Sequence, residues 1–265
     1  MITAVELGLI YAIMALGVYL TFRILDFPDL TVDGSFTTGA AVASVGIVNG
    51  MNPWLATVLA FFAGMVAGVI TGLLHTKGKI DGLLAGILTM IALYSVNLRI
   101  MGKANTPLLG EETLISPMRA AGILGSAASV AILFGVCLVF VAAIVWFLHT
   151  ELGMAMRATG DNQEMIRSFG VSTDNQKILG LALSNGLVAL SGAVIAQYQG
   201  FADIGMGIGL ILIGLASVIV GQAIFTQRFI WLAAIAVVFG AVIYRLVIQL
   251  ALSAGLEVND MKLIS

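Results

Sequence analysis

A short acidic stretch, residues 26–35, carries the polar side chains that are best suited to contact a solute. Asp26, Asp29 and Asp33 lie within eight positions and lead directly into an apolar segment. Carboxylates at membrane depth are costly unless they face a cavity or a partner. The stretch is therefore a candidate for a polar site in an otherwise apolar chain.

Two interpretations of this stretch are open. Pro28 and Gly34 would interrupt a regular helix, which is tolerated inside a membrane only where the backbone lines protein or water. In the first interpretation, a broken helix opens its N-terminus onto a solute pathway and is capped by Asp33 or Ser35. In the second, the stretch is an ordinary cytoplasmic turn whose Asp33 cap contacts water.

Other polar residues interrupt the apolar segments. Asn97 and Arg99 lie within residues 81–101, and Asn185 lies within residues 177–198. Such groups usually pair at membrane depth, and most of them form hydrogen bonds between helices. The candidate pathway residues are Asp33, Ser35, Thr38 and Asn97.

The sequence shows no arrangement typical of catalysis or metal binding. It has no Gly-x-x-x-x-Gly-Lys-Ser/Thr phosphate loop and no His-Glu-x-x-His. His75 and His149 are far apart, and Cys137 has no second cysteine to pair with. We expect no catalytic residue, no metal and no cofactor on this chain, so any energy source would be a partner or an ion gradient.

Composition indicates a membrane protein. The 265 residues are 60% hydrophobic and 10% charged, with a mean hydropathy of +1.09, whereas soluble domains are about 25% charged. The net charge of −2 argues against nucleic acid as a partner, because phosphate binding needs clustered Lys and Arg. The lipid bilayer is the expected surrounding.

The sequence predicts an all-α, polytopic transmembrane bundle with about eight spans, in a single domain over residues 1–265. The first apolar run has no basic start and no cleavage site, so it is a retained span and not a signal peptide. A helical span needs about 20 apolar residues. The expected spans are 3–24, 33–50, 53–75, 81–101, 127–149, 177–198, 206–225 and 229–250.

Basic residues between the spans predict the orientation. The connection 150–176 carries Arg157 and Arg167 and is bordered by Lys177, so it is expected on the cytoplasmic side. The N-terminus would then lie outside. Arg23, Lys77, Lys79 and Arg228 would also lie inside, while Arg99, Lys103 and Arg119 would be exceptions on the outside.

The chain contains a candidate inverted repeat. A Phe-x-Asp-aliphatic pattern begins at Phe27 and again at Phe201, each time before a Gly-rich segment. After a one-residue insertion, Gly34, Gly39, Val45 and Gly46 align with Gly209, Gly214, Val220 and Gly221. The copies lie five spans apart and would have opposite orientations, which is typical of a transport pathway. Chance alignment of Gly-rich helices is the alternative.

The first repeat would cover about residues 3–101 and the second about residues 177–265. Residues 261–265 resemble the start of a further span. They could be a truncated span or a short interfacial segment, and the sequence leaves both open.

The connection 150–176 contains a predicted short helix. Residues 160–162 (Gly-Asp-Asn) offer a turn and an N-cap, residues 164–169 form the helix, and Gly170 ends it. The apolar face would consist of Met165, Ile166 and Phe169. So short a helix has little stability alone and is typical of a knob that docks into another protein. An amphipathic loop on the lipid headgroups is the alternative.

This connection resembles the cytoplasmic coupling loop of permease subunits of bacterial ABC importers of the branched-chain amino-acid type. Members share Thr-x-x-Gly-x-x-x-Arg-Ala-x-Gly-x-Asn, followed by a short helix and Gly-(Val/Ile). The matching residues are Thr150, Gly153, Arg157, Ala158, Gly160, Asn162, Gly170 and Val171. Residues 27–36 resemble a subgroup of single-permease importers, some of them assigned to aromatic amino acids.

The resemblance implies a permease subunit of an ATP-driven importer in the bacterial cytoplasmic membrane. Two copies would form a homodimeric pathway for a small solute such as an aromatic or branched-chain amino acid. A dimer of ABC ATPase subunits would carry the ATP and Mg, and an extracellular substrate-binding protein would deliver the solute. The ATPase-coupling residues would be Gly153, Arg157, Ala158, Gly160, Asp161, Asn162, Met165, Ile166, Phe169 and Gly170.

An ion-gradient-driven secondary transporter is the rival interpretation. It would share the inverted repeat and the broken helices. It would also be expected to bury acids at mid-depth in several spans, whereas the acids here cluster at the ends of the predicted spans.

Overall fold

Helices make up most of the computed structural model, which describes residues 1–225 and 229–253. The helices are α1 (Ile2–Val18), continued by the π-helix η1 (Tyr19–Ile24), α2 (Thr31–Val48), α3 (Pro53–Thr76), α4 (Gly82–Met101), α5 (Ser116–Ala120), α6 (Ala127–Leu148), α7 (Glu151–Asp161), α8 (Gln163–Ser168), α9 (Thr173–Gln199), α10 (Leu210–Ile224) and α11 (Ile230–Ser253). Strands β1 (Asn105–Pro107) and β2 (Phe201–Asp203) pair antiparallel.

A helix lies at each of the predicted span positions, but not all of these helices have the length and hydropathy typical of a membrane span. Among the described residues, six are long and apolar enough, namely α1 with η1, α3, α4, α6, α9 and α11. The chain is therefore a multi-pass, all-α membrane protein. The predicted spans 33–50 and 206–225 correspond to α2 and α10, which do not meet these criteria.

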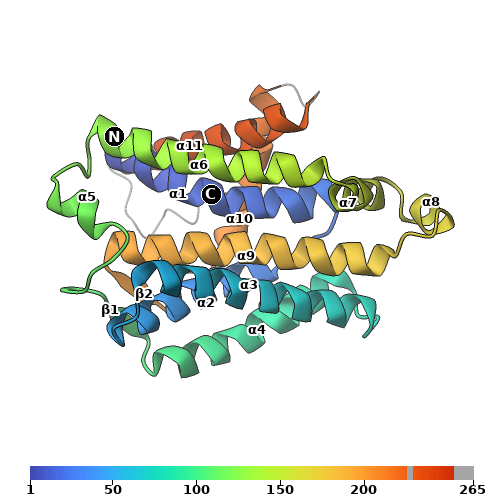
Figure 1. Cartoon of the computed structure of the whole chain (residues 1–265), viewed down its shortest axis with the longest axis horizontal. Coiled ribbons are helices and arrows are strands. Elements are labelled where there is room, and N and C mark those ends of the chain that lie inside the picture. Colours follow the sequence, from blue (N-terminus) through green and yellow to red (C-terminus); the bar gives the residue numbers. More distant parts are fainter. Residues whose placement is uncertain (226–228, 254–265) are drawn as a thin grey trace.

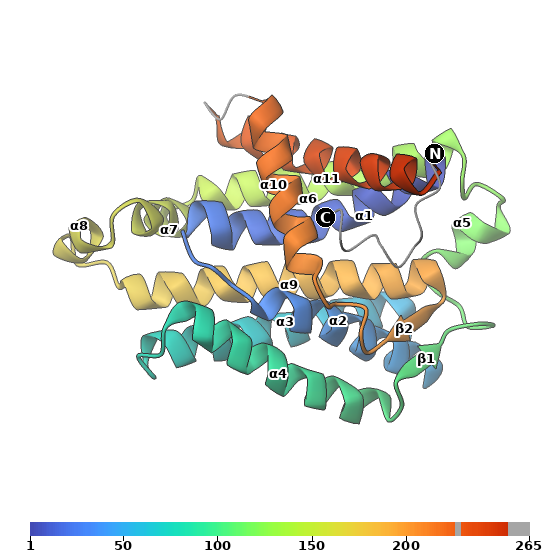
Figure 2. The ribbon, with the colours of Figure 1, turned by 180° about the vertical axis from the view of Figure 1, so that it is seen from behind.

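The predicted span 206–225 was placed too early. Residues 201–203 pair with β1, and Gly209 adopts a left-handed conformation with φ of +83°, so α10 begins only at Leu210. Its 15 residues reach about 22 Å at about 1.5 Å per residue, less than the hydrocarbon thickness of about 30 Å. Figure 2 shows α10 crossing the direction of the long helices.

The long helices lie side by side, and their connections gather at two ends (Figure 1). One end carries α7 and α8, and the opposite end carries the N-terminus, α5 and the β1–β2 pair. The basic residues predicted to be cytoplasmic lie in or beside elements at the α7–α8 end, namely Arg23, Lys77, Lys79, Arg157, Arg167 and Lys177. Arg228 and residues 261–265 fall outside the described residues.

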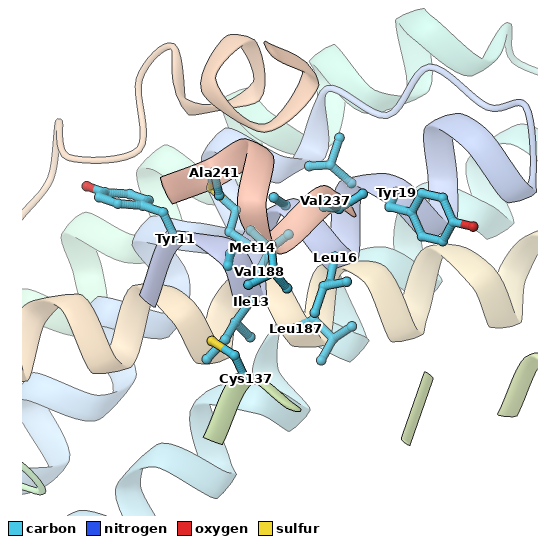
Figure 3. Packing of buried hydrophobic residues seen from close by; sticks show 14 of the residues in the cluster. Tyr11, Ile13, Met14, Leu16, Tyr19, Cys137, Leu187, Val188, Val237 and Ala241 are labelled. Atoms are coloured by element: carbon cyan, nitrogen blue, oxygen red, sulfur yellow. The ribbon is translucent and has the colours of Figure 1, made fainter. Parts of the chain in front are cut away.

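Helix α1 forms the centre of the main hydrophobic core. Figure 3 shows its side chains, such as Met14, surrounded by Cys137 from α6, Val188 from α9 and Val237 from α11. Met14 and Val188 are fully buried. Because α1 is covered on several sides by other helices, it is the scaffold against which the polar elements are positioned.

Helices α2 and α3 approach α9 so closely that side chains are excluded at the contacts. A Cβ atom at Gly39 would overlap the backbone of Ala189, and one at Gly64 or Gly68 would overlap carbonyl oxygens of α9. Small residues at helix contacts are typical of membrane bundles. The Gly-rich composition of these segments is therefore explained by close packing.

Candidate functional site

Asp33 lies in the first turn of α2, and its carboxylate reaches α10. Its Oδ2 accepts a hydrogen bond from the backbone N of Gly209 at 2.7 Å, and its Oδ1 accepts one from Ile211 at 2.8 Å. The first amides of a helix lack partners within the helix, and the helix dipole favours a negative charge there. Asp33 therefore caps a helix other than its own.

The expected cap of α2 by Asp33 or Ser35 is not formed. Ser35 donates instead to Asn185 Oδ1 at 2.6 Å. The backbone N of Thr31, the first residue of α2, donates to Asp29 Oδ1 at 2.9 Å. The sequence assigned the Asp33 carboxylate to the wrong helix, because its partner Ile211 lies 178 positions further along the chain.

A cavity of about 380 Å³ lies beside Asp33. Its volume falls within the range of about 300–1,000 Å³ that small-molecule sites occupy. Its wall consists of Asp33, Gly34 and Thr37 from α2, Met90, Ile91, Tyr94, Ser95 and Asn97 from α4, and Ile204 and Ile208 from the segment before α10. Two of the predicted pathway residues, Asp33 and Asn97, therefore line one cavity.

Asn97 contributes a buried acceptor to this wall. Its side chain is 1% exposed, and its Nδ2 donates to the carbonyl oxygen of Gly34 at 3.3 Å. Its Oδ1 has no hydrogen-bond partner among the residues that the structure describes. Buried polar atoms are nearly always partnered, so one without a partner calls for an explanation.

The other two predicted pathway residues do not line the cavity. Thr38 donates to the Gly34 carbonyl oxygen of its own helix at 2.9 Å, and Ser35 lies against α9. Both side chains are buried. Their role in a pathway stays a prediction, and their observed contacts are structural.

A polar network that the sequence did not predict joins the stretch before α2 to α9. Asn185 Nδ2 donates to Asp29 Oδ2 at 2.6 Å, while Asn185 Oδ1 accepts from Ser35. Asp29 is only 3% exposed. The sequence identified Asn185 as a residue that hydrogen-bonds between helices, which is confirmed, but nothing in the sequence identified Asp29 as its partner.

A second buried carboxylate was missed at the opposite end of the bundle. Glu6 of α1 accepts hydrogen bonds from Tyr198 Oη at 2.6 Å, from the backbone N of Gly125 at 2.8 Å and from Ser129 Oγ. These contacts join α1 to α9 and to the start of α6. Among the described residues, no three His, Cys, Asp or Glu side chains come together as a metal site.

The predicted short helix forms at the projecting end as α8. Asn162 Oδ1 accepts from the backbone N of Met165 at 3.0 Å, which confirms the predicted N-cap. Gly170 has φ of +84°, as expected of a residue that ends a helix. The predicted apolar face is divided, because Ile166 is buried whereas Phe169 is 74% exposed and Met165 is 47% exposed.

The preceding residues form α7, a helix that the sequence did not predict. Gly153 and Gly160 lie in this helix, and a Cβ at either position would overlap a backbone carbonyl oxygen, that of Phe147 or that of Ile24. The two glycines let α7 pack directly onto the ends of α6 and η1. The other predicted coupling residues on this helix are Arg157, Ala158 and Asp161.

Comparison with known proteins gives consistent results. Residues 1–264 match the family described as "Branched-chain amino acid transport system / permease component". The chain is 44% identical over 270 residues to a tyrosine transport system permease protein of Clostridioides difficile, which covers 100% of this chain and 87% of the relative. It is 37% identical over 268 residues to an uncharacterized protein of Rickettsia prowazekii, which covers 100% of this chain and 93% of the relative.

One solved structure shares the fold. It is an inward-facing conformation of a metal-chelate type ABC transporter, with a TM-score of 0.52 and 17% sequence identity. The superposition covers 96% of this chain and 76% of the other.

Proposed function

The chain belongs to the family of branched-chain amino acid transport system permease components, and on that premise we propose that it lines the pathway of an ATP-driven importer for an amino acid. It is a transport subunit and not an enzyme. The relative from Clostridioides difficile is a tyrosine transport permease. An aromatic or branched-chain amino acid is therefore the substrate class that we assign to this chain.

The observation that carries the proposal is the exposed apolar surface formed by α8 and Phe169, the residue that follows it. This helix lies at the far end of the bundle (Figure 1), and Phe169 and Met165 expose 74% and 47% of their surface. Large apolar side chains on a short, capped helix are suited to a groove on another protein. We assign that groove to an ABC ATPase subunit, and α8 to the role of coupling helix.

The complete importer would contain further partners. Two ATPase subunits would bind ATP and Mg, a second copy of this chain would complete a homodimer, and an extracellular binding protein would deliver the substrate. The basic residues at the α7–α8 end support a cytoplasmic position for this end, in a bacterial cytoplasmic membrane. Non-helical segments before both α2 and α10 are consistent with the proposed inverted repeat.

A co-purification experiment tests the proposal. The chain is co-expressed with an ABC ATPase subunit from the same organism and reconstituted in lipid nanodiscs, and wild type is compared with Phe169→Asp. The charge should prevent docking, because burying an unpaired carboxylate is costly. Wild type is expected to retain the ATPase, and the variant is expected to lose it while keeping its melting temperature.

The matched control is Ser168→Asp, which places the same charge one residue earlier on the exposed surface. It is expected to weaken ATPase binding less than Phe169→Asp. If folded wild-type chain binds no ATPase, the importer assignment fails and an ion-gradient transporter takes its place. If both variants bind like wild type, α8 is not the docking element.

A further inference from the structure

We propose that the cavity between α2, α4 and the segment 204–208 is a substrate-binding subsite of the permease itself, in which Asn97 and Asp33 receive the ammonium group of an amino acid. This inference rests on the proposed function and adds a recognition step within the membrane subunit. It assigns part of the selectivity to this chain.

The orientation of the Asn97 amide determines what the site can bind. Amide oxygen and nitrogen are normally assigned from their hydrogen-bond partners. Here the Gly34 carbonyl can only accept, so the Asn97 nitrogen must face it at 3.3 Å. The buried Oδ1 is therefore an acceptor without a partner among the described residues, and a ligand must supply a donor to satisfy it.

Asp33 gives the same wall a negative charge in a fixed position. Two backbone amides at the start of α10 hold its carboxylate. These contacts fix the position of the Asp33 carboxylate at the wall of the cavity. A carboxylate beside a buried amide oxygen favours a cationic donor over a neutral hydroxyl, because hydrogen bonds between charged groups are the stronger ones.

The rest of the wall suits an apolar side chain. Met90, Ile91 and Tyr94 come from α4, and Ile204 and Ile208 come from the opposite segment. A volume of about 380 Å³ admits a solute of amino-acid size. A cationic donor site with an apolar wall fits an amino acid with a large apolar or aromatic side chain.

The test is protection of a cysteine from labelling. Ser95→Cys is introduced at the exposed edge of the cavity in the complete transporter in proteoliposomes, and its reaction with a maleimide is timed. Cys137 is 1% exposed and gives little background. L-Tyrosine is expected to slow labelling severalfold, and 3-(4-hydroxyphenyl)propionate, which lacks the amine, is expected to leave the rate unchanged.

Variants at Asn97 distinguish a loss of tyrosine binding from a loss of folding. Asn97→Leu in the same background should raise the tyrosine concentration for half protection at least about tenfold, the usual effect of losing a hydrogen bond to a charged group. Asn97→Asp keeps the acceptor but loses the donor to the Gly34 carbonyl oxygen, so half protection is expected at a concentration between those of wild type and Asn97→Leu. Ser168→Cys on α8 serves as the control position, where tyrosine should give no protection.

The outcomes are distinguishable from failure of the proposed function, because ATP-dependent tyrosine uptake is measured in the same proteoliposomes. Uptake without protection means that water alone fills the cavity, which overturns the inference and leaves the importer assignment standing. Equal protection by the deaminated compound overturns the assignment of the ammonium group. Protection without ATP-dependent uptake supports the subsite and contradicts the importer role.

Discussion

Asp33 and Ile211 are 178 positions apart, and Oδ1 of Asp33 accepts a hydrogen bond from the backbone N of Ile211 at 2.8 Å. The contact joins the first turn of α2 to the first turn of α10, the two segments that the sequence pairs as copies of a repeat. The start of α10 therefore depends on a residue of α2. A ligand in the adjoining cavity would contact both segments.

Removing this carboxylate should loosen the start of α10. Asp33→Ala leaves two helix amides without their acceptor, and losing such a cap costs about 1 kcal/mol. Faster hydrogen exchange is expected at the start of α10, measured by mass spectrometry. Asp81→Ala, which removes the cap of α4 at Leu83, is the control and should leave α10 unchanged. Equal exchange in both variants would contradict the capping role.

Asn185 is expected to be essential for stability. Asn185→Leu removes the donor to buried Asp29 and the acceptor for Ser35. A buried polar group that loses its hydrogen-bond partner costs about 1–3 kcal/mol, so the melting temperature in detergent should fall measurably. Asn175→Leu on the exposed first turn of the same helix should change it little. A small effect at Asn185 would show that water can replace its amide.

The contact between α2 and α9 should tolerate no added carbon. Gly39→Ala places a Cβ against the Ala189 carbonyl group, and overpacking of this kind costs about 1–3 kcal/mol or more. Gly135→Ala in α6, where no atom lies within 4 Å of the added carbon, is the matched control and should be neutral or slightly stabilising. The measurement is the melting temperature of both variants in the same detergent, and equal values would contradict the close packing.

Gly160 should matter for coupling more than for ATPase binding. Gly160→Ala forces α7 away from the Ile24 carbonyl oxygen but leaves the exposed Phe169 in place. We expect the variant to bind the ATPase and to transport severalfold less solute per ATP hydrolysed. Uptake and phosphate release are measured together in proteoliposomes, with Ser168→Ala as the control. An unchanged ratio of solute transported to ATP hydrolysed would show that α7 can shift without affecting coupling.

Much of the fold could be predicted from the sequence, because span positions depend on local composition. All eight predicted segments contain a helix, and Asn162 and Gly170 were correctly placed as the start and end of α8. The errors lie where contacts between distant segments determine where a helix begins. Because β2 pairs with β1, α10 begins only at Leu210. No local sequence pattern predicts that pairing.

The candidate site could be predicted only in part. Asp33 and Asn97 stood out because polar residues are rare in apolar segments, and they do share a cavity. Ser35 and Thr38 stood out for the same reason, yet their hydroxyls are used inside the bundle. Composition identifies the polar residues that need hydrogen-bond partners. Only the packing of distant helices determines which of these residues line a cavity.

The length of helix α9 allows a small motion at one end of the molecule to become a larger one at the other end. It begins beside α8, passes Asn185 and ends next to β2, from which the chain continues along the cavity. Its 27 residues extend about 40 Å at about 1.5 Å per residue. As a lever of that length, it would convert a tilt of about 5° at the coupling end into a shift of about 3.5 Å at the far end, a displacement comparable to the width of a water molecule.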